Sequence, residues 1–502
     1  MPQLQSQIPP KVSRITATLE AAGYQAWIVG GCVRDLLIGR KPKDWDITTN
    51  ANPEQIQGLF ENTFYTNEFG TVGVVNDPPS PKATEGQAQQ SDTSVRVVEI
   101  TPYRLEGKYS DARRPDSVIF SQNIEDDLKR RDFTVNALAY NATTGELLDF
   151  YEGIKDIHAG VLRAVGDPQE RFNEDALRIM RAVRIAAELD FSIDPATKQA
   201  MAQCAEQLAK ISKERIRDEF VRIINSQKPR RALILSHEIG ILRFIAPELE
   251  QGIGVDQNQA HSFDVYEHNL RALQHAADKG WSFDIRLAAL FHDIGKPATR
   301  RWSDDKRDWT FHGHDVVGAK IAKKALESLK FPRETIEKTR NLVRWHMFFS
   351  DPDKVTLSAV RRIITNVGRE NIGDLVQLRI CDRIGTGRPK EQPFRFRKYQ
   401  AMIDQALRDP ISVTMLAIDG KRAMEVTGEN PGPRIGWLLH ALLEDVLDDP
   451  ARNTADYLET KIVALSKLPD EQLKAIGIEA KSKKEEAEEA DLEEIRKRHF
   501  VD

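Results

Sequence analysis

Two aspartates separated by one residue, Asp44 and Asp46, follow a pair of glycines at Gly30 and Gly31. The segment AWIVGGCVRDLLIGRKPKDWDITTN begins with an apolar run, turns at the glycines and continues through a helical stretch. On a strand, residues i and i+2 point to the same face, so the two carboxylates are expected to converge and share hard divalent cations. The glycines lack the Cβ atoms that would keep a phosphate from the backbone amides. This combination predicts phosphoryl or nucleotidyl transfer from a nucleoside triphosphate.

Two further segments supply groups that such a reaction needs. Glu99, in an expected strand, is the best candidate for a third carboxylate that helps to bind the metals and orient the attacking hydroxyl. In the segment KRRDFTVNA (129–137), cationic side chains stand beside a carboxylate and an amide. Arginine donates bidentately to phosphate oxygens. Asp132 and Asn136 are suited to bonding a ribose, although such a cluster alone is more often a surface charge group.

A later helical segment, EDALRIMRAVR (174–184), carries regularly spaced charges. Asp175 and Arg178 are i and i+3, so we expect them on one helical face. Arg181 continues that face and Arg184 extends it. On an ordinary helix this pattern would be a surface salt bridge.

The second half of the chain carries a separate set of histidines and aspartates. His292 and Asp293 end an apolar helical run in LAALFHDIGKP, where both side chains can reach one metal. Imidazole and carboxylate together suit Mn²⁺, Fe²⁺, Co²⁺, Ni²⁺ or Zn²⁺. The other candidates in this half are His268, His314, His346 and Asp382.

The composition is that of an ordinary globular protein. The 502 residues are 40% hydrophobic and 30% charged, with a net charge of −5, and the length predicts on the order of three domains. Three widely spaced cysteines, Cys32, Cys204 and Cys381, indicate neither a disulfide framework nor a thiolate cluster. No signal-peptide pattern occurs, and no apolar run approaches the roughly 20 residues of a membrane span. We therefore expect a cytoplasmic protein with no membrane partner; nothing in the sequence indicates its oligomeric state.

The chain is expected to have four parts. Residues 1–155 mix helix and strand, 156–255 are helical, 256–400 are helical and hold the metal candidates, and 401–502 are helical and charged.

Two features interrupt this plan. Within the first part, expected strands at Val72–Val75 and Val95–Ile100 flank a Pro-, Ser- and Gln-rich excursion at 77–94, interpreted as a mobile hairpin insertion. The chain ends in AKSKKEEAEEADLEEIRKRH, expected to be a solvated helix with pairs such as Lys481 and Glu485.

Four motifs occur in a fixed order: GGCVRD with DWD, RRDFTVNA, EDALRIMRAVR and KERIRDEF (213–220). Together they resemble the motifs of the class II CCA-adding tRNA nucleotidyltransferases and bacterial poly(A) polymerases, over about residues 20–225. The resemblance implies an α+β nucleotidyltransferase head with a small mixed sheet, followed by an all-α neck, body and tail. It implies a Mg²⁺-dependent attack of a tRNA 3′-hydroxyl on the α-phosphate of CTP or ATP, releasing pyrophosphate. By motif, Asp44 and Asp46 hold the metals, Gly31, Arg34 and Arg131 contact the nucleotide, and Asp132 lies at its ribose.

The resemblance also assigns Asp175 and Arg178 to reading the base. Cytosine and adenine both present an exocyclic amine, which a carboxylate accepts, beside a ring nitrogen to which a guanidinium donates. Uracil and guanine present the reverse pattern, and each buried group left unpaired costs roughly 1–3 kcal/mol. Arg181 and Arg184 then either contact the triphosphate or hold the helix.

The histidine pattern resembles the HD metal-dependent phosphohydrolase superfamily, which implies a helical domain with a metal site. His268, His292, Asp293 and Asp382 match its core pattern, and His314 and His346 match the extra ligands of two-metal members. Our hypothesis is a divalent transition metal or Mg²⁺ and a phosphatase or 2′,3′-cyclic phosphodiesterase activity. The alternative is an inert remnant that only packs the body.

Several alternatives share these motifs. A CC-only or A-only enzyme would keep all of them and differ in the loop after the Glu99 strand, about Tyr103 to Pro115. A poly(A) polymerase is disfavoured because FGTVGVVND replaces the basic stretch typical of those relatives. A protein that is mainly an HD phosphohydrolase, or a non-catalytic tRNA-binding module, is disfavoured by the intact Asp44 and Asp46.

Overall fold

The computed structural model describes residues 2–66, 70–76, 93–107, 117–257, 262–347, 355–410 and 412–473. Most of the predicted 77–94 excursion, positions 108–116 of the loop after the Glu99 strand, and the charged C-terminal helix lie outside these residues. The chain forms two compact units, residues 1–244 and 245–502.

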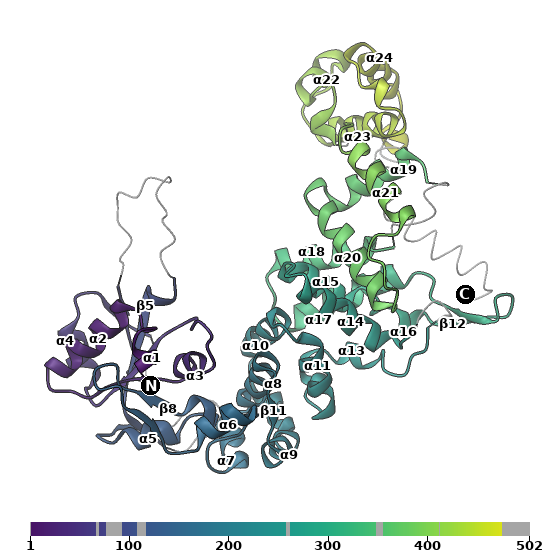
Figure 1. The fold of residues 1–502 in the computed structure, drawn as a ribbon. Helices are drawn as coiled ribbons and strands as arrows, with labels where there is room; N and C mark the ends of the chain where they lie inside the picture. Colours follow the sequence, from purple (N-terminus) through teal and green to yellow (C-terminus); the bar gives the residue numbers. More distant parts are fainter. Residues whose placement is uncertain are drawn as a thin grey trace. The chain divides into compact units, whose positions relative to one another are not determined.

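A seven-stranded mixed sheet lies at the N-terminal end of the first unit (Figure 1). β2 pairs in parallel with β5, and the other neighbouring strands of this sheet are antiparallel. In sheet order the strands are β3 (Thr63–Tyr65), β4 (Val72–Val75), β5 (Val97–Pro102), β2 (Asp46–Thr49), β1 (Ala26–Val29), β8 (Leu138–Tyr140) and β9 (Leu147–Asp149). Two short pairs, β6 (Arg104–Glu106) with β7 (Val118–Phe120) and β10 (Val161–Leu162) with β11 (Ser192–Ile193), lie outside it. The predicted small mixed sheet is confirmed.

The burial of β1 and the turn that follows it agree with the sequence. All four of its residues are buried, as expected of a strand covered on both faces, whereas β5 alternates half-buried and buried positions. β1 ends where Gly30 adopts a φ of 85°, a left-handed conformation that glycine reaches without steric cost. The chain then enters helix α3 (Gly31–Leu37). The predicted strand, glycine turn and helix are confirmed.

Helices make up most of the rest of the first unit. They are α1 (Pro2–Gln5), α2 (Pro10–Ala21), α4 (Pro53–Leu59), α5 (Ile124–Lys129), α6 (Gly153–Ala159), α7 (Pro168–Glu174), α8 (Leu177–Leu189), α9 (Pro195–Gln203), α10 (Lys213–Asn225), α11 (Pro229–Glu238) and α12 (Leu242–Ile245), the last of which meets the unit boundary. α8 packs against α10 and α11.

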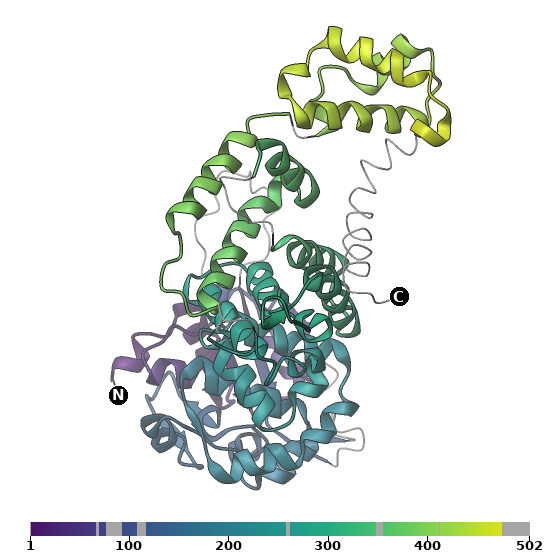
Figure 2. The ribbon, with the colours of Figure 1, turned by 90° about the vertical axis from the view of Figure 1, so that its right-hand side faces the viewer.

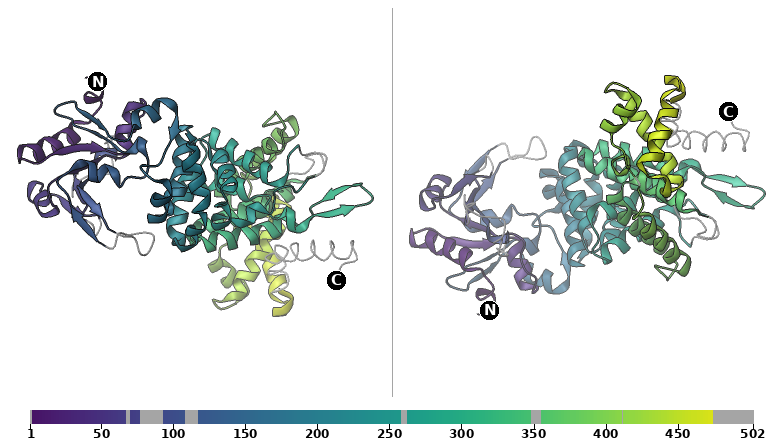
Figure 3. Two further views of the ribbon diagram at one scale, coloured as in Figure 1. Left: turned by 90° about the horizontal axis from the view of Figure 1, so that it is seen from below. Right: turned by 90° about the horizontal axis from the view of Figure 1, so that it is seen from above.

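The second unit is helical in its described part (Figure 2), apart from the hairpin of β12 (Arg301–Ser303) and β13 (Asp308–Thr310), whose strands lie side by side (Figure 3). Its helices are α13 (Pro247–Glu250), α14 (Val265–Asp278), α15 (Phe283–Phe291), α16 (Lys296–Thr299), α17 (His314–Ser328), α18 (Arg333–Trp345), α19 (Leu357–Val367), α20 (Ile372–Gly385), α21 (Phe394–Ala406), α22 (Gly420–Thr427), α23 (Pro433–Asp448) and α24 (Ala455–Ser466). A buried apolar cluster runs from Ala272 on α14 to Leu473. The helical character predicted for this half is confirmed, and the four-part domain division stays a prediction.

Candidate active sites

The parallel pairing of β2 with β5 places Glu99 directly beside Asp46 as its register partner. The Glu99 N–H donates to the Trp45 carbonyl at 3.2 Å. Burial raises the pKa of Asp46 to about 7, helped by Asp44 and Glu99 and opposed by Arg131. Burial and then Asp44 also raise the pKa of Glu99. Asp44 therefore disfavours the charged forms of both Asp46 and Glu99, and a divalent cation relieves such an arrangement.

The expectation that Asp44 and Asp46 both lie on a strand is wrong for Asp44. The last pair between β2 and β1 is Asp46 with Val29, because the backbone turns away at Gly30. Asp44 lacks a partner strand and lies exposed in a bend before β2. Its charge still acts on Asp46 and Glu99.

Gly30 borders the carboxylate cluster. A Cβ at this position would stand 3.0 Å from Arg131 Nη1 and 3.4 Å from Asp46 Oδ2. A Cβ at Gly31 would stand 3.4 Å from Arg34 Nη2. The two glycines therefore keep open the space between a carboxylate and two guanidinium groups, as the predicted phosphate cradle requires.

A chain of hydrogen bonds links four of the predicted nucleotide contacts. Arg34 Nη1 donates to Asn136 Oδ1 at 2.6 Å, and Asn136 Nδ2 donates to Asp132 Oδ1 at 3.1 Å. Arg181 Nε donates to the other oxygen of Asp132 at 2.8 Å. Burial would raise the pKa of Asp132, but Arg181 and Asn136 lower it to about 2. Asp132 is thus an ionised carboxylate that holds an arginine from α8 against the head.

The expected pairing of Asp175 with Arg178 on one helical face is wrong. Asp175 has an extended backbone (φ −145°, ψ 103°), and α8 begins after it, at Leu177. Asp175 Oδ1 accepts from the Leu177 N–H at 3.0 Å, and aspartate favours such local bonds over helical conformation. Its other oxygen, Oδ2, accepts from Arg215 Nη2 of α10 at 2.7 Å.

Arg178 and Arg184 also have partners that the sequence did not indicate. Arg178 Nη1 lies 2.5 Å from Glu174 Oε2, and its Nη2 donates to the Arg130 carbonyl at 3.2 Å. Arg184 Nε lies 2.8 Å from Glu219 Oε2 on α10. Arg184 therefore joins α8 to α10, and its Nη1 also lies 3.1 Å from Glu188 Oε2.

A cavity of about 330 Å³ brings most of these groups together. It is lined by Asp46, Ile47, Glu99, Thr101, Arg130, Arg131, Asp132, Asp175, Leu177, Arg178, Arg181 and Arg215. The predicted residues outside this lining are Gly30, Gly31, Arg34, Asp44, Asn136 and Arg184. Carboxylates of the sheet thus face arginines and Asp175 across one space.

Two arginines of this cavity lack partners for buried donors. Arg131 Nε and Arg215 Nη1 are buried and have no hydrogen-bond partner among the residues that the structure describes. Buried donors are rarely left unpaired, which indicates that a ligand completes the site. Sequence reasoning missed Arg130 and Arg215 because, within their motifs, they look like surface arginines.

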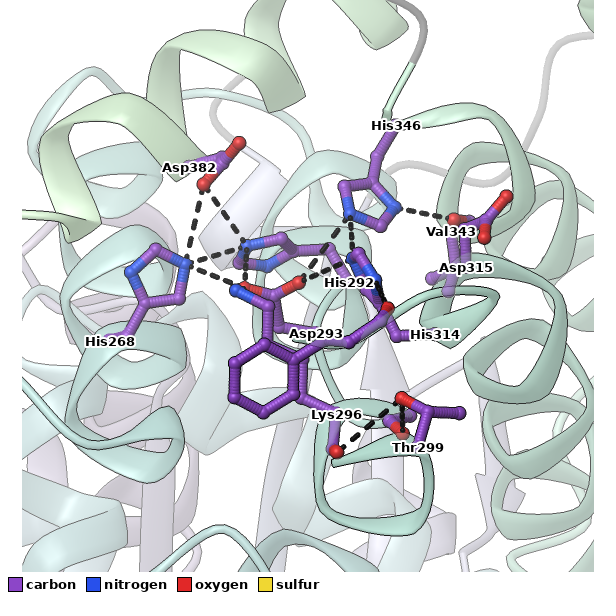
Figure 4. Close-up of polar contacts among 12 residues, drawn as sticks. His268, His292, Asp293, Lys296, Thr299, His314, Asp315, Val343, His346 and Asp382 are labelled. Carbon is purple, nitrogen blue, oxygen red and sulfur yellow. Dashed lines mark hydrogen bonds and ion pairs between the residues drawn. The ribbon is translucent and has the colours of Figure 1, made fainter. Parts of the chain in front are cut away.

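The histidine candidates gather in the second unit (Figure 4). His268 of α14 and His292, which follows α15, point their Nε2 atoms at Asp293 Oδ2 from 3.0 and 3.3 Å. The same Nε2 atoms lie 3.4 and 3.7 Å from Asp382 Oδ1 of α20. Burial alone would lower the pKa of His292, but the two aspartates raise it to about 9, so this position favours positive charge.

A second group faces the other oxygen of Asp293. The Nε2 atoms of His314 and His346 lie 3.2 and 3.5 Å from Asp293 Oδ1 and 3.3 Å from each other. Nδ1 of His314 donates to the Phe311 carbonyl and Nδ1 of His346 to the Val343 carbonyl, both at 2.6 Å. A neutral ring of this tautomer presents a lone pair at Nε2. The two Nε2 lone pairs and the Asp293 carboxylate face one another, and such acceptors fit a cation. Asp293 belongs both to this group and to the group of His268, His292 and Asp382.

Three protein families match successive parts of the chain: "Poly A polymerase head domain" at residues 26–163, "Probable RNA and SrmB- binding site of polymerase A" at 190–253, and "HD domain" at 265–384. The CCA-adding enzyme of Lactobacillus delbrueckii subsp. bulgaricus is 46% identical over 438 residues, which are 87% of this chain and 93% of that protein. The chain belongs to the CCA-adding enzyme family. Another family member, the CCA-adding enzyme of Lactobacillus helveticus, is 32% identical over 456 residues, or 89% of this chain and 95% of its own.

Solved CCA-adding enzymes have a similar fold. The Bacillus stearothermophilus CCA-adding enzyme in complex with CTP matches with a TM-score of 0.64 and 26% identity, over 91% of this chain and 98% of that one. The Thermotoga maritima CCA-adding enzyme complexed with tRNA shares the fold, with a TM-score of 0.55 and 19% identity over 92% and 98% of the two chains. The predicted CCA-adding family and the predicted fold class are confirmed. Among the described residues, no helix has the length and apolar character needed to cross a bilayer.

Proposed function

We propose that this chain adds C and A to tRNA 3′ ends from CTP and ATP, with no nucleic acid template and with release of pyrophosphate. Membership of the CCA-adding enzyme family supports this activity. The observation that carries it is one cavity in which Asp46 and Glu99 face Asp175 and Arg178. The expected compartment is the cytoplasm, and the unpaired, buried state of the cysteines accords with a reducing environment.

The carboxylate cluster is the proposed Mg²⁺ site. Asp44 and Asp46 supply the hard oxygen ligands that Mg²⁺ prefers. Bound Mg²⁺ stabilises the charge that develops on the transferring phosphoryl group. Glu99, the register partner of Asp46, is placed to orient the tRNA 3′-hydroxyl and to take its proton.

The reaction forms one bond and breaks one. The 3′-oxygen of the tRNA bonds to the α-phosphorus, and the bond from that phosphorus to the pyrophosphate oxygen breaks. Arg131 and Arg181 border the cavity with donors suited to phosphate oxygens, while Gly30 and Gly31 let the triphosphate approach the backbone. Arg34 and Asn136 fix Asp132 for contact with the ribose.

Base choice rests on Asp175 and Arg178. The carboxylate accepts from the exocyclic amine of cytosine or adenine, and the guanidinium donates to the adjacent ring nitrogen. The protein acts as the template. Because Asp175 is held by Arg215 and not by Arg178, both reading groups keep separate supports and can face one base edge together.

The test is addition to tRNA that ends at the discriminator base, with CTP alone, ATP alone or both. Addition of C, C and A in that order supports the proposal; a stop after CC, or a need for pre-made CC, supports a partial enzyme. Repeated A addition supports a poly(A) polymerase. Asp44→Ala with Asp46→Ala should abolish addition, and near-normal incorporation by that variant would refute the metal role.

The histidine cluster supports a second activity, the hydrolysis of a phosphomonoester or 2′,3′-cyclic phosphodiester. His268, His292, Asp293 and Asp382 would hold one divalent ion, and Asp293, His314 and His346 would hold another. Such ions activate water and polarise a phosphoryl oxygen. In the reaction a water oxygen bonds to phosphorus, the ester P–O bond breaks, and the leaving oxygen gains a proton. Lys296, whose Nζ lies 2.6 Å from Asp293 Oδ2, fixes the bridging carboxylate.

Metal analysis of the purified protein tests whether the histidine cluster binds the divalent metal that this activity requires. Wild-type protein should contain divalent metal, and His292→Ala with Asp293→Ala should lose it together with phosphatase activity. Equal metal content in the two proteins would leave the cluster as an inert remnant.

A further inference from the structure

A cavity of about 600 Å³ opens beside the histidine cluster. Asp293, His314 and Asp382 line one side of it, and α20 contributes Arg379 and Arg383. These two arginines are one helical turn apart and so share a face. The volume is within the usual range for ligand pockets, roughly 300–1,000 Å³.

Five cationic and five acidic side chains line this cavity, so its affinity for an anion depends on which of them are paired. Its acidic residues outside the metal groups include Asp315, which pairs with Arg344 at 2.5 Å, and Glu391, which pairs with Lys279 at 2.7 Å. By contrast, Arg383 Nε donates to the Lys390 carbonyl. Within the described ranges, neither the Arg383 side chain nor the Arg388 side chain has a carboxylate partner. Two guanidinium groups therefore stay available for phosphate oxygens.

The cavity continues onto an exposed basic segment, residues 388–398. Arg388, Pro393 and Phe396 of this segment line the cavity, while Phe394 has 72% of its surface exposed. Arg395 and Arg397 follow Phe394 in the chain and are also exposed. An exposed ring followed by exposed arginines, next to a cavity lined by guanidinium groups, is the composition of a single-strand nucleic acid surface.

We propose that the cavity receives the phosphorylated end of a single-stranded polynucleotide, with the strand backbone at Arg383 and Arg388 and a base on Phe394. This proposal rests on the phosphohydrolase function proposed for the histidine cluster and names its substrate. The terminal phosphate lies at the metal groups, and the strand leaves across residues 388–398. A free mononucleotide would use the cavity but not Phe394.

The test compares hydrolysis of a short 3′-phosphorylated RNA with hydrolysis of p-nitrophenyl phosphate by the full chain. Arg383→Gln with Arg388→Gln, and separately Phe394→Ala, should each lower kcat/KM for the RNA about tenfold and change that for the small ester less than about twofold. Arg369→Gln with Arg408→Gln makes the same charge change at exposed positions outside the cavity and should affect neither substrate. Equal losses on both substrates, or none, would overturn the proposal.

Binding gives a readout that does not depend on hydrolysis. For RNA binding, the slope of the logarithm of the binding constant against the logarithm of the salt concentration should be about 1.4 smaller in magnitude for the double arginine variant. Each phosphate that an arginine no longer neutralises removes about 0.7 from this slope. An unchanged slope would refute strand binding at this cavity. If the wild-type protein hydrolyses neither substrate, while the wild-type and variant proteins still differ in salt slope as expected, only the hydrolase function is refuted.

Discussion

Arg215→Ala is expected to reduce base selection more than nucleotide binding. Arg215 Nη2 holds Asp175 Oδ2 at 2.7 Å, whereas the Leu177 N–H bonds only the other oxygen, Oδ1. Hydrogen bonds to charged groups contribute about 1.5–3 kcal/mol. The two side chains are 23% and 17% exposed, so solvent screening favours the lower value. Since about 1.4 kcal/mol is a tenfold rate ratio, the kcat/KM ratio of CTP over UTP should fall about tenfold.

The assay is single-nucleotide addition to tRNA that lacks its CCA end, with each of the four triphosphates. Arg217→Ala is the matched control, because Arg217 lies on the same helix and pairs with the adjacent Asp218. Arg215→Lys should restore part of the selectivity by keeping the charge. Unchanged CTP preference in a folded Arg215→Ala protein would refute the idea that Arg215 positions Asp175.

Three further outcomes follow from contacts elsewhere in the molecule. Glu219→Ala should lower the free energy of unfolding by about 2 kcal/mol, measured by denaturant titration, because Arg184 loses one charged hydrogen bond and keeps only its pair with Glu188. Without Mg²⁺, stability should fall as pH rises from 3.8 to about 7, since folded Asp46 keeps its proton over that range; Asp46→Asn or added Mg²⁺ should flatten this slope in thermal melts. His314→Ala with His346→Ala should lower bound metal by about half, and full metal content would contradict two separate groups.

Sequence reasoning succeeded where the pattern is local or the residue types are unusual. Glu99 could be placed beside the aspartates because it lies in a short apolar strand run, and β5 confirms that placement. The six-membered histidine and aspartate cluster could be proposed because His292 and Asp293 are adjacent at a helix end and the other four residues match the HD pattern. In both cases the chemistry of the side chain and the periodicity pointed the same way.

Sequence reasoning failed where a side-chain hydrogen bond takes a residue out of the helix that its spacing predicts. Helical spacing predicted Asp175 on the same face as Arg178, but the Asp175 carboxylate caps the next turn and draws the residue out of the helix. A signal existed, since aspartate ahead of an apolar helical run is a common N-terminal residue. Arg215 gave no such signal: its partner lies 40 residues away in sequence, and only tertiary packing brings them together.

The parallel pairing of β2 with β5 also sets an order of assembly during synthesis of the chain. Positions 46 and 99 are register neighbours, yet β3 and β4 lie between them in the chain and occupy the edge of the same sheet. Closing so long a loop is slow and cannot begin until β5 has emerged. In a nascent chain Asp46 therefore stays without its register partner Glu99 until β5 has been synthesised.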